Sequence, residues 1–287
     1  MDDDLRRAAI ELYDRFTHDG MDRRIFMSRM VALAGSVTAA QAVVGAIAAS
    51  PAAAAIVPAD EPRLVTRAMT LANGYKAYVA EGRTRSLKPT VLLIHENRGL
   101  NEHTRDVGRR LALAGYRAVA PDMLSLVGGT PSNEDAAREA IGKLDLAKSV
   151  EAGVAMLEEL ARNSRAGMVG AVGFCWGGGY VNRLAVEAGG KLDAGVSFYG
   201  PAPDAGEAAR VEAPLLIHLA ELDERVNRTG FPWVSALREA GKKVTFFLYD
   251  DVNHAFHNDT SAERYNKPAA ELAWKRTLRF FRRHLGA

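Results

Sequence analysis

After Pro62 the chain alternates short apolar runs with longer segments whose apolar residues recur at helical spacing. The run TVLLIH at 90–95 is continuously apolar, as a buried central strand is. This alternation predicts an α/β fold with a mostly parallel central sheet and helices on both faces. The turn Ala72-Asn73-Gly74 predicts an antiparallel entry hairpin. The expected strands are 64–70, 75–80, 90–95, 117–121, 167–173, 193–199, 214–219 and 243–249, and the expected helices are 101–114, 133–162, 176–187, 228–240 and 267–284.

Residues 1–58 differ in composition from the α/β domain expected over 59–287, and they predict a separate N-terminal extension. No charged residue occurs between Met30 and Ala59, and the run is rich in Ala, Gly, Val and Ser. The preceding segment Asp22-Arg23-Arg24-Ile25-Phe26 resembles a twin-arginine export signal, with an Ala-x-Ala cleavage site near Ala52 to Ala55. The pattern therefore predicts a periplasmic or secreted protein.

The alternative for this extension is a pair of helices, 4–17 and 23–47, that stay packed on the domain of a cytoplasmic protein. Because its apolar run is only weakly hydrophobic, it is not expected to form a stable membrane anchor.

Charge and cysteine content exclude several classes of protein. The chain has 37 basic and 35 acidic side chains and no long run of one sign, so a nucleic-acid partner is not expected. Its single cysteine, Cys175, excludes an internal disulfide and a zinc site built from several thiols. The oligomeric state stays open at this level.

The segment Gly173-Phe174-Cys175-Trp176-Gly177 follows an expected strand and begins an expected helix. A nucleophile placed at such a tight turn has strained backbone angles, and glycines two residues to either side avoid clashes with it. The positive end of the helix dipole favours the thiolate, which is the attacking form of cysteine. We therefore interpret Cys175 as a catalytic nucleophile; the alternative is a small buried apolar residue.

A nucleophile of this kind needs a base and a carboxylate that orients the base, in the chain order nucleophile, acid, histidine. Asp223 follows the strand expected at 214–219, and His254 follows the last expected strand. These residues are the predicted acid and base. Neighbouring or isolated residues of the same types remain alternatives: Glu221 and Glu224 for the acid, and His257, His95, His103 and His218 for the base.

With these motifs, the region from about Leu64 to the C-terminus resembles the dienelactone hydrolase (carboxymethylenebutenolidase) family, which has the α/β-hydrolase fold. The resemblance implies hydrolysis of a small carboxylic ester or lactone through a thioester with Cys175. It also implies that Glu96 contacts the thiol and helps to generate the thiolate. In this fold the backbone N–H groups of Trp176 and Asn97 are the expected oxyanion donors.

The family binds its substrate carboxylate with two arginines, one of them a few residues beyond the catalytic histidine. Here that segment reads His254-Ala255-Phe256-His257-Asn258, without an arginine. Arg98, Arg138 and Arg264 are therefore the candidate substrate-binding residues, and the substrate itself stays open.

Two other functions are weighed against hydrolysis. A catalytically idle hydrolase fold would act as a binding or partner protein. A thiol redox role would need a resolving cysteine, which the chain lacks. No metal or organic cofactor is expected, because His254 and His257 lie in a loop without a matching cluster of ligands.

Overall fold

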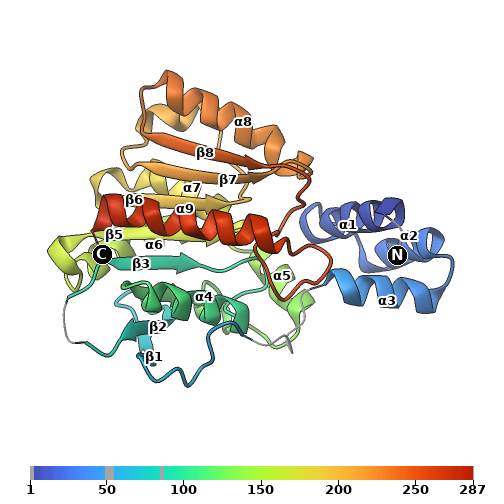
Figure 1. Ribbon diagram of the computed structural model, residues 1–287, viewed down its shortest axis with the longest axis horizontal. Coiled ribbons are helices and arrows are strands. Elements are labelled where there is room, and N and C mark those ends of the chain that lie inside the picture. The colour runs from blue at the N-terminus through green and yellow to red at the C-terminus, as the bar shows by residue number, and fades with distance from the viewer. Residues whose placement is uncertain (1–2, 49–54, 85–86, 287) are drawn as a thin grey trace.

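A single mixed sheet organises the molecule (Figure 1). The computed structural model describes residues 3–48, 55–84 and 87–286. The strand order is β1-β2-β4-β3-β5-β6-β7-β8; the pairs β1·β2 and β2·β4 are antiparallel, and the other neighbours are parallel. The strands are β1 (Leu64–Thr70), β2 (Lys76–Gly82), β3 (Thr90–Ile94), β4 (Arg117–Pro121), β5 (Val169–Phe174), β6 (Ala194–Phe198), β7 (Leu215–Ala220) and β8 (Val244–Tyr249).

Helices cover both faces of this sheet, which confirms the predicted layers. On one face, α4 (Glu102–Leu113) and α9 (Lys267–Leu285) bury Val107, Leu111 and Phe281 against it. On the other face, α6, α7 and α8 bury residues such as Tyr180 and Trp233. The helices of this second face are α6 (Leu146–Ala161), α7 (Trp176–Glu187) and α8 (Glu224–Glu239). The other helical segments of this region are α5 (Glu134–Gly142), η1 (Ser125–Val127), η2 (Arg165–Gly167), η3 (Gly189–Lys191) and η4 (Ala205–Arg210).

Two helices expected to be continuous are broken in the structure. The expected helix 133–162 divides into α5 and α6 because Asp145 starts a new helix by accepting the backbone N–H of Lys148. The expected helix 23–47 divides at Gly35, which has a left-handed φ of 83°, and Ser36 caps the next helix. Local capping therefore outweighs apolar periodicity at both places.

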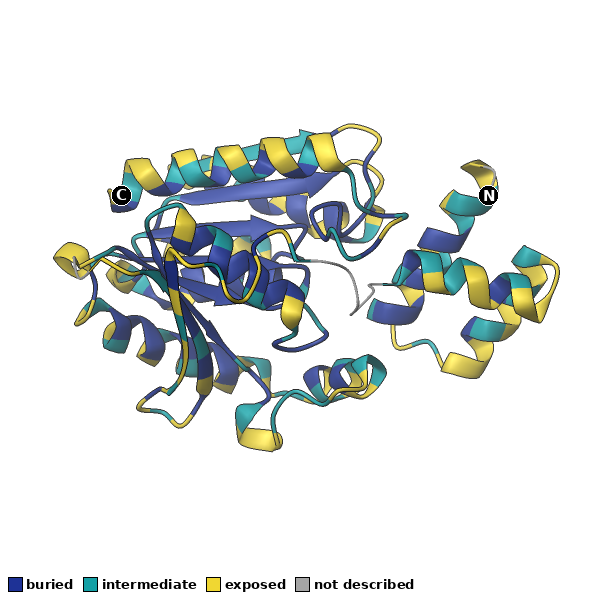
Figure 2. Cartoon of the chain, turned by 60° about the horizontal axis from the view of Figure 1, so that its bottom comes forward, coloured by how far each residue is buried: buried dark blue, intermediate teal, exposed yellow. Residues whose placement is uncertain are grey.

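The N-terminal residues form a three-helix unit, which we call the cap: α1 (Asp3–His18), α2 (Arg23–Ala34) and α3 (Val37–Ile47). Figure 1 shows the cap beyond the tip of β3, at the end of the sheet where the parallel strands finish. Figure 2 shows buried positions on the inner sides of its helices and exposed positions on their outer sides. Its buried cluster is separate from the clusters of the sheet region, which we call the body.

No single helix among the described residues has the length and hydropathy of a membrane span. The pair α2 and α3 meets that test only jointly, across a bend of 107°. The expected cleavage site near Ala52 to Ala55 falls mostly on residues 52–54, which lie outside the described residues.

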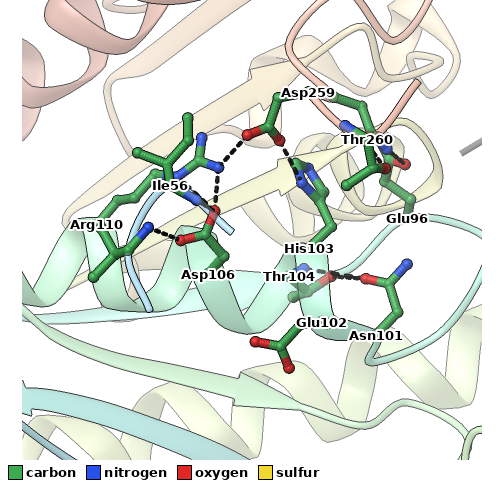
Figure 3. Close-up of polar contacts among 12 residues, drawn as sticks. Ile56, Glu96, Asn101, Glu102, His103, Thr104, Asp106, Arg110, Asp259 and Thr260 are labelled. Atoms are coloured by element: carbon green, nitrogen blue, oxygen red, sulfur yellow. Dashed lines mark hydrogen bonds and ion pairs between the residues drawn. The ribbon is translucent and has the colours of Figure 1, made fainter. Parts of the chain in front are cut away.

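A buried carboxylate fixes the chain where it enters the body (Figure 3). Asp106 of α4 accepts the backbone N–H groups of Ile56, at 3.1 Å, and Val57, at 2.8 Å. Arg110 binds Asp106 and also donates to Asp259 at 2.7 Å. One cluster on α4 thus joins the start of the body to the loop that precedes α9.

Candidate active site

Cys175 lies at the turn between β5 and α7 and is 4% exposed. Its backbone has φ 54° and ψ −117°, a strained conformation for a residue with a side chain. A Cβ added at Gly173 would lie 2.0 Å from the carbonyl oxygen of Gly177, and one at Gly177 would lie 2.5 Å from the carbonyl oxygen of His95. The two glycines therefore make this turn possible and present the thiol beyond the sheet.

Asp223 and His254 lie together at the ends of neighbouring strands. His254 Nδ1 is 2.5 Å from Asp223 Oδ2, and both side chains are buried. Asp223 also caps α8 by accepting the N–H of Val226, which fixes the orientation of the carboxylate. With Nδ1 used in this way, Nε2 of His254 is the ring nitrogen left for Cys175.

The charges of this site shift the pKa values of the histidine and the aspartate. Burial lowers the pKa of His254, but the negative charges of Asp223 and Cys175 outweigh it and raise the pKa to about 10. Burial raises the pKa of Asp223, but the charge of His254 and its hydrogen bond outweigh it and lower the pKa. The raised pKa of His254 favours an imidazolium, which the carboxylate of Asp223 holds.

The residues that were alternatives to Asp223 and His254 are exposed or have other partners. Glu221 and Glu224 are exposed, whereas Asp223 is buried. His95 accepts the N–H of Met123, and the other histidines are engaged or buried elsewhere: His218 with Thr277 and Tyr249, His103 beside Asp259, and His257 among Phe174, Phe198 and Trp274.

Glu96 lines the same cavity as Cys175, but its carboxylate has two partners outside the triad. The hydroxyl of Tyr199 donates to Oε1 at 3.2 Å, and the amide of Asn258 donates to Oε2 at 2.8 Å. The Tyr199 ring also packs edge-on against His254, with centroids 5.0 Å apart. Tyr199 and Asn258 are not among the predicted site residues. Tyr199 ends the strand expected at 193–199, and Asn258 lies in the segment that follows His254.

Both expected oxyanion donors are near the nucleophile. Trp176 is the first residue of α7, so its backbone N–H has no acceptor within the helix. Asn97 lines the cavity, and its side-chain amide donates to the carbonyl oxygen of Thr17 in the cap, at 3.3 Å.

Of the three candidate arginines, the structure brings two to the cavity. Arg98 and Arg264 line it, whereas Arg138 does not. Arg98 donates to the hydroxyl of Tyr13 at 2.9 Å, and Arg264 lies 3.6 Å from the carboxylate of Asp14. Arg138 stacks instead on Phe16, with its guanidinium carbon 4.2 Å from the ring centroid, and donates to the Phe16 carbonyl. All three arginines therefore hold α1.

The cap also places His18, which is not a predicted site residue, at the nucleophile. His18 Nε2 lies 3.8 Å from Cys175 Sγ, and its ring centroid is 4.8 Å from that of His254. Burial and the positive charge of His254 lower the pKa of His18 well below its ordinary value. No local pattern marks His18, since it lies 157 positions from Cys175 in the chain.

Residues of the cap narrow the cavity that contains Cys175. Its volume is about 20 Å³, and Tyr13, Thr17 and His18 form part of its wall. A groove of about 520 Å³ lies on the other side of Tyr13 and Arg98, which line both spaces, and it is bordered by α2, α3 and α5.

A cysteine at a strand-to-helix turn of a mostly parallel sheet, beside a histidine held by an aspartate, defines the α/β-hydrolase class. The dienelactone hydrolase family model matches residues 75–285, and the chain belongs to that family. It is a hydrolase of carboxylic esters or lactones.

Similar proteins agree with this assignment. A putative carboxymethylenebutenolidase of Methylorubrum extorquens is 32% identical over 227 residues, which cover 73% of this chain and 76% of the relative. One from Escherichia coli O157:H7 is 31% identical over 260 residues, covering 83% and 94% of the two chains. The crystal structure of a putative dienelactone hydrolase from Klebsiella pneumoniae has a TM-score of 0.69 and 26% identity, covering 76% and 98%.

Proposed function

We propose that the protein cleaves its ester or lactone through a thioester with Cys175. The observation that carries this proposal is the buried arrangement of Cys175, His254 and Asp223. The thiolate attacks the carbonyl carbon, and the N–H groups of Trp176 and Asn97 stabilise the oxyanion. When the C–O bond breaks, the imidazolium of His254 gives its proton to the leaving oxygen, and Asp223 keeps the imidazole oriented.

Water completes the reaction. Neutral His254 takes a proton from a water molecule, and the resulting hydroxide attacks the thioester carbonyl. The C–S bond then breaks, the carboxylic acid leaves, and the proton on His254 re-forms the thiolate–imidazolium pair. No oxidant, no reductant and no substrate other than water and the ester is required.

The cap must move before an ester reaches Cys175. A space of about 20 Å³ holds about one water molecule and no ester. The contact between Tyr13 and Arg98 separates this space from the groove of about 520 Å³. We therefore place the entry route at this contact, with α1 displaced during substrate binding.

Displacement of α1 also favours an anionic substrate. In the closed state Asp14 and Tyr13 occupy Arg264 and Arg98. Once α1 leaves, Arg264 and Nη2 of Arg98 lose these partners, while Nη1 of Arg98 stays 3.3 Å from Asp135 of α5. The freed guanidinium N–H groups suit a carboxylate. We propose that the substrate is an ester or lactone that carries a carboxylate.

We also propose that the extension directs export through its twin-arginine pattern. Arg23 pairs with Asp135 and Arg24 is exposed, so both arginines of the pattern lie on the surface of the cap. Fractionation of expressing cells tests this proposal. A mature N-terminus near Ile56 in the periplasm would support it, and an intact cytoplasmic chain would contradict it.

A panel of aryl esters and lactones, with and without a carboxylate, tests the reaction. Metal-free wild-type protein is compared with Cys175→Ser and Cys175→Ala, and mass spectrometry of quenched reactions looks for the acyl group on Cys175. Carboxylated substrates should be preferred. Full activity of Cys175→Ala would exclude the thioester route, and no turnover of any substrate would favour an idle binding protein.

A further inference from the structure

Three metal-ligating atoms converge where the cap meets the active site. They are Nε2 of His18, Sγ of Cys175 and a ring nitrogen of His254, and all lie within 4.8 Å of one another. The separation between His18 Nε2 and Cys175 Sγ is 3.8 Å. In a tetrahedral zinc site with ordinary bond lengths, ligand atoms are about 3.3–3.6 Å apart. A contraction of at most about 1.5 Å would therefore bring the three atoms to bonding distance of one ion.

The surroundings of His254 match those of a metal-binding histidine. Its Nδ1 is held by the carboxylate of Asp223, and carboxylates commonly orient the imidazole ligands of zinc in this way. Its Nε2 is buried and has no hydrogen-bond partner among the described residues. This nitrogen therefore offers a free lone pair on the side of Cys175 and His18 once the ring is neutral.

We propose that the closed protein binds one zinc or similar transition-metal ion through His18, Cys175 and His254. A thiolate with two imidazoles is a donor set preferred by borderline and soft ions rather than by Mg²⁺ or Ca²⁺. The fourth position is left for water. The metal occupies the nucleophile and its base, so the bound form is inactive.

His18 would make the bound metal a link between the cap and the body. It is the last residue of α1, whereas the other two ligands belong to the body. A metal bound by all three therefore ties the cap to the body and stabilises the closed state by mass action. The inference uses the thiol and imidazole of the proposed hydrolase, but metal binding does not depend on turnover.

Spectroscopic titration of the reduced, full-length protein with Co²⁺ tests the site without any substrate. We expect one ion per chain and a near-ultraviolet thiolate-to-cobalt band, which Cys175→Ser should lose. His18→Gln keeps a polar side chain of similar length but removes the imidazole, and it should weaken binding at least about tenfold. His284→Gln, which alters a histidine in the last turn of α9, should bind as wild type does.

Zn²⁺ competition against a chromogenic chelator and hydrogen exchange of residues 3–18 give the second readout. Zinc should slow exchange in wild type but not in His18→Gln. Absence of binding, or equal affinity in wild type and His18→Gln, would overturn the proposal. Hydrolysis is measured separately with chelator present, so failure of the metal site and failure of the proposed hydrolase give different results.

Discussion

The cap and the body are held together internally by apolar packing, but they are held to each other mainly by polar contacts. In the cap, Phe16 and Phe26 stack with ring centroids 4.2 Å apart inside a small separate cluster. Across the boundary, Arg6 binds Glu263, Arg23 binds Asp135 and Asn97 binds Thr17. Contacts of this kind cost less to break than a continuous apolar core. The difference indicates a body that carries the chemistry and a cap able to separate from it.

The largest expected effect on kcat/KM comes from removing the nucleophile, which belongs to the body. Cys175→Ala should lower kcat/KM by at least about 10³-fold, because the attacking atom is lost. His18→Gln, on the other side of the same cavity, should not lower kcat/KM when a chelator is present. Steady-state kinetics on an active ester measure both variants. A loss of activity in His18→Gln as large as that in Cys175→Ala would place part of the chemistry in the cap.

A reversible covalent link tests whether the cap must move. The backbone N–H of Glu263 donates to the carbonyl of Ala46 at 3.4 Å across the boundary, so we choose these two positions for a pair of cysteines. The oxidised double variant should lose at least about 90% of its turnover, and reductant should restore it, because the ester cannot enter the closed cavity.

Wild type and both single variants, treated in the same way, control for oxidation of Cys175 and for the lost Arg6–Glu263 pair. If the linked protein turned over at the wild-type rate, the substrate would have to reach Cys175 without separation of the cap.

The third prediction concerns the stability that the ionised carboxylate of Asp259 gives to the body. Burial raises the pKa of Asp259, but hydrogen bonding from His103 and the charge of Arg110 outweigh it and lower the pKa to about 2. The ionised carboxylate therefore stabilises the folded state above its unfolded pKa near 4, and this contribution is lost as the pH falls toward 2. Asp259→Asn should lower the free energy of unfolding at pH 7 by about 2 kcal/mol.

Urea unfolding at pH 7 and at pH 3 measures this effect. The difference between wild type and Asp259→Asn should shrink at the lower pH. Asp251→Asn, which changes an exposed carboxylate, is the matched control. Equal stability of Asp259→Asn and wild type at pH 7 would argue against this contribution.

The smallest expected effect concerns the entry route. Tyr13→Phe keeps the ring in the cap but removes the hydroxyl that accepts from Arg98. Loss of one such hydrogen bond, worth about 1 kcal/mol, should favour opening and raise kcat/KM about fivefold. Tyr116→Phe is the control, since its buried hydroxyl has no partner among the described residues. An unchanged kcat/KM in Tyr13→Phe would move the entry route elsewhere.

The strand-to-helix turn at Cys175 depends on neighbours along the chain, and such local features can be predicted from the sequence. The apolar run before Gly173 and the glycines around Cys175 predict a tight turn between a strand and a helix. The chain order nucleophile, acid, histidine predicts that Asp223 orients His254. The continuity predicted for helix 133–162 was wrong, because Asp145 begins a new helix by accepting the N–H of Lys148. His18 could not be predicted, since its position depends on docking of the whole cap.

The carboxylate of Asp106 has a consequence for a processed chain. If the extension were removed after Ala55, Ile56 would carry a new α-ammonium group in place of its amide, at the nitrogen that now lies 3.1 Å from Asp106 Oδ2. A hydrogen bond from a neutral amide would thereby become an ion pair with a buried carboxylate. Proteolytic maturation would then exchange one restraint for another: the active site would lose its cover while the new N-terminus became anchored more firmly.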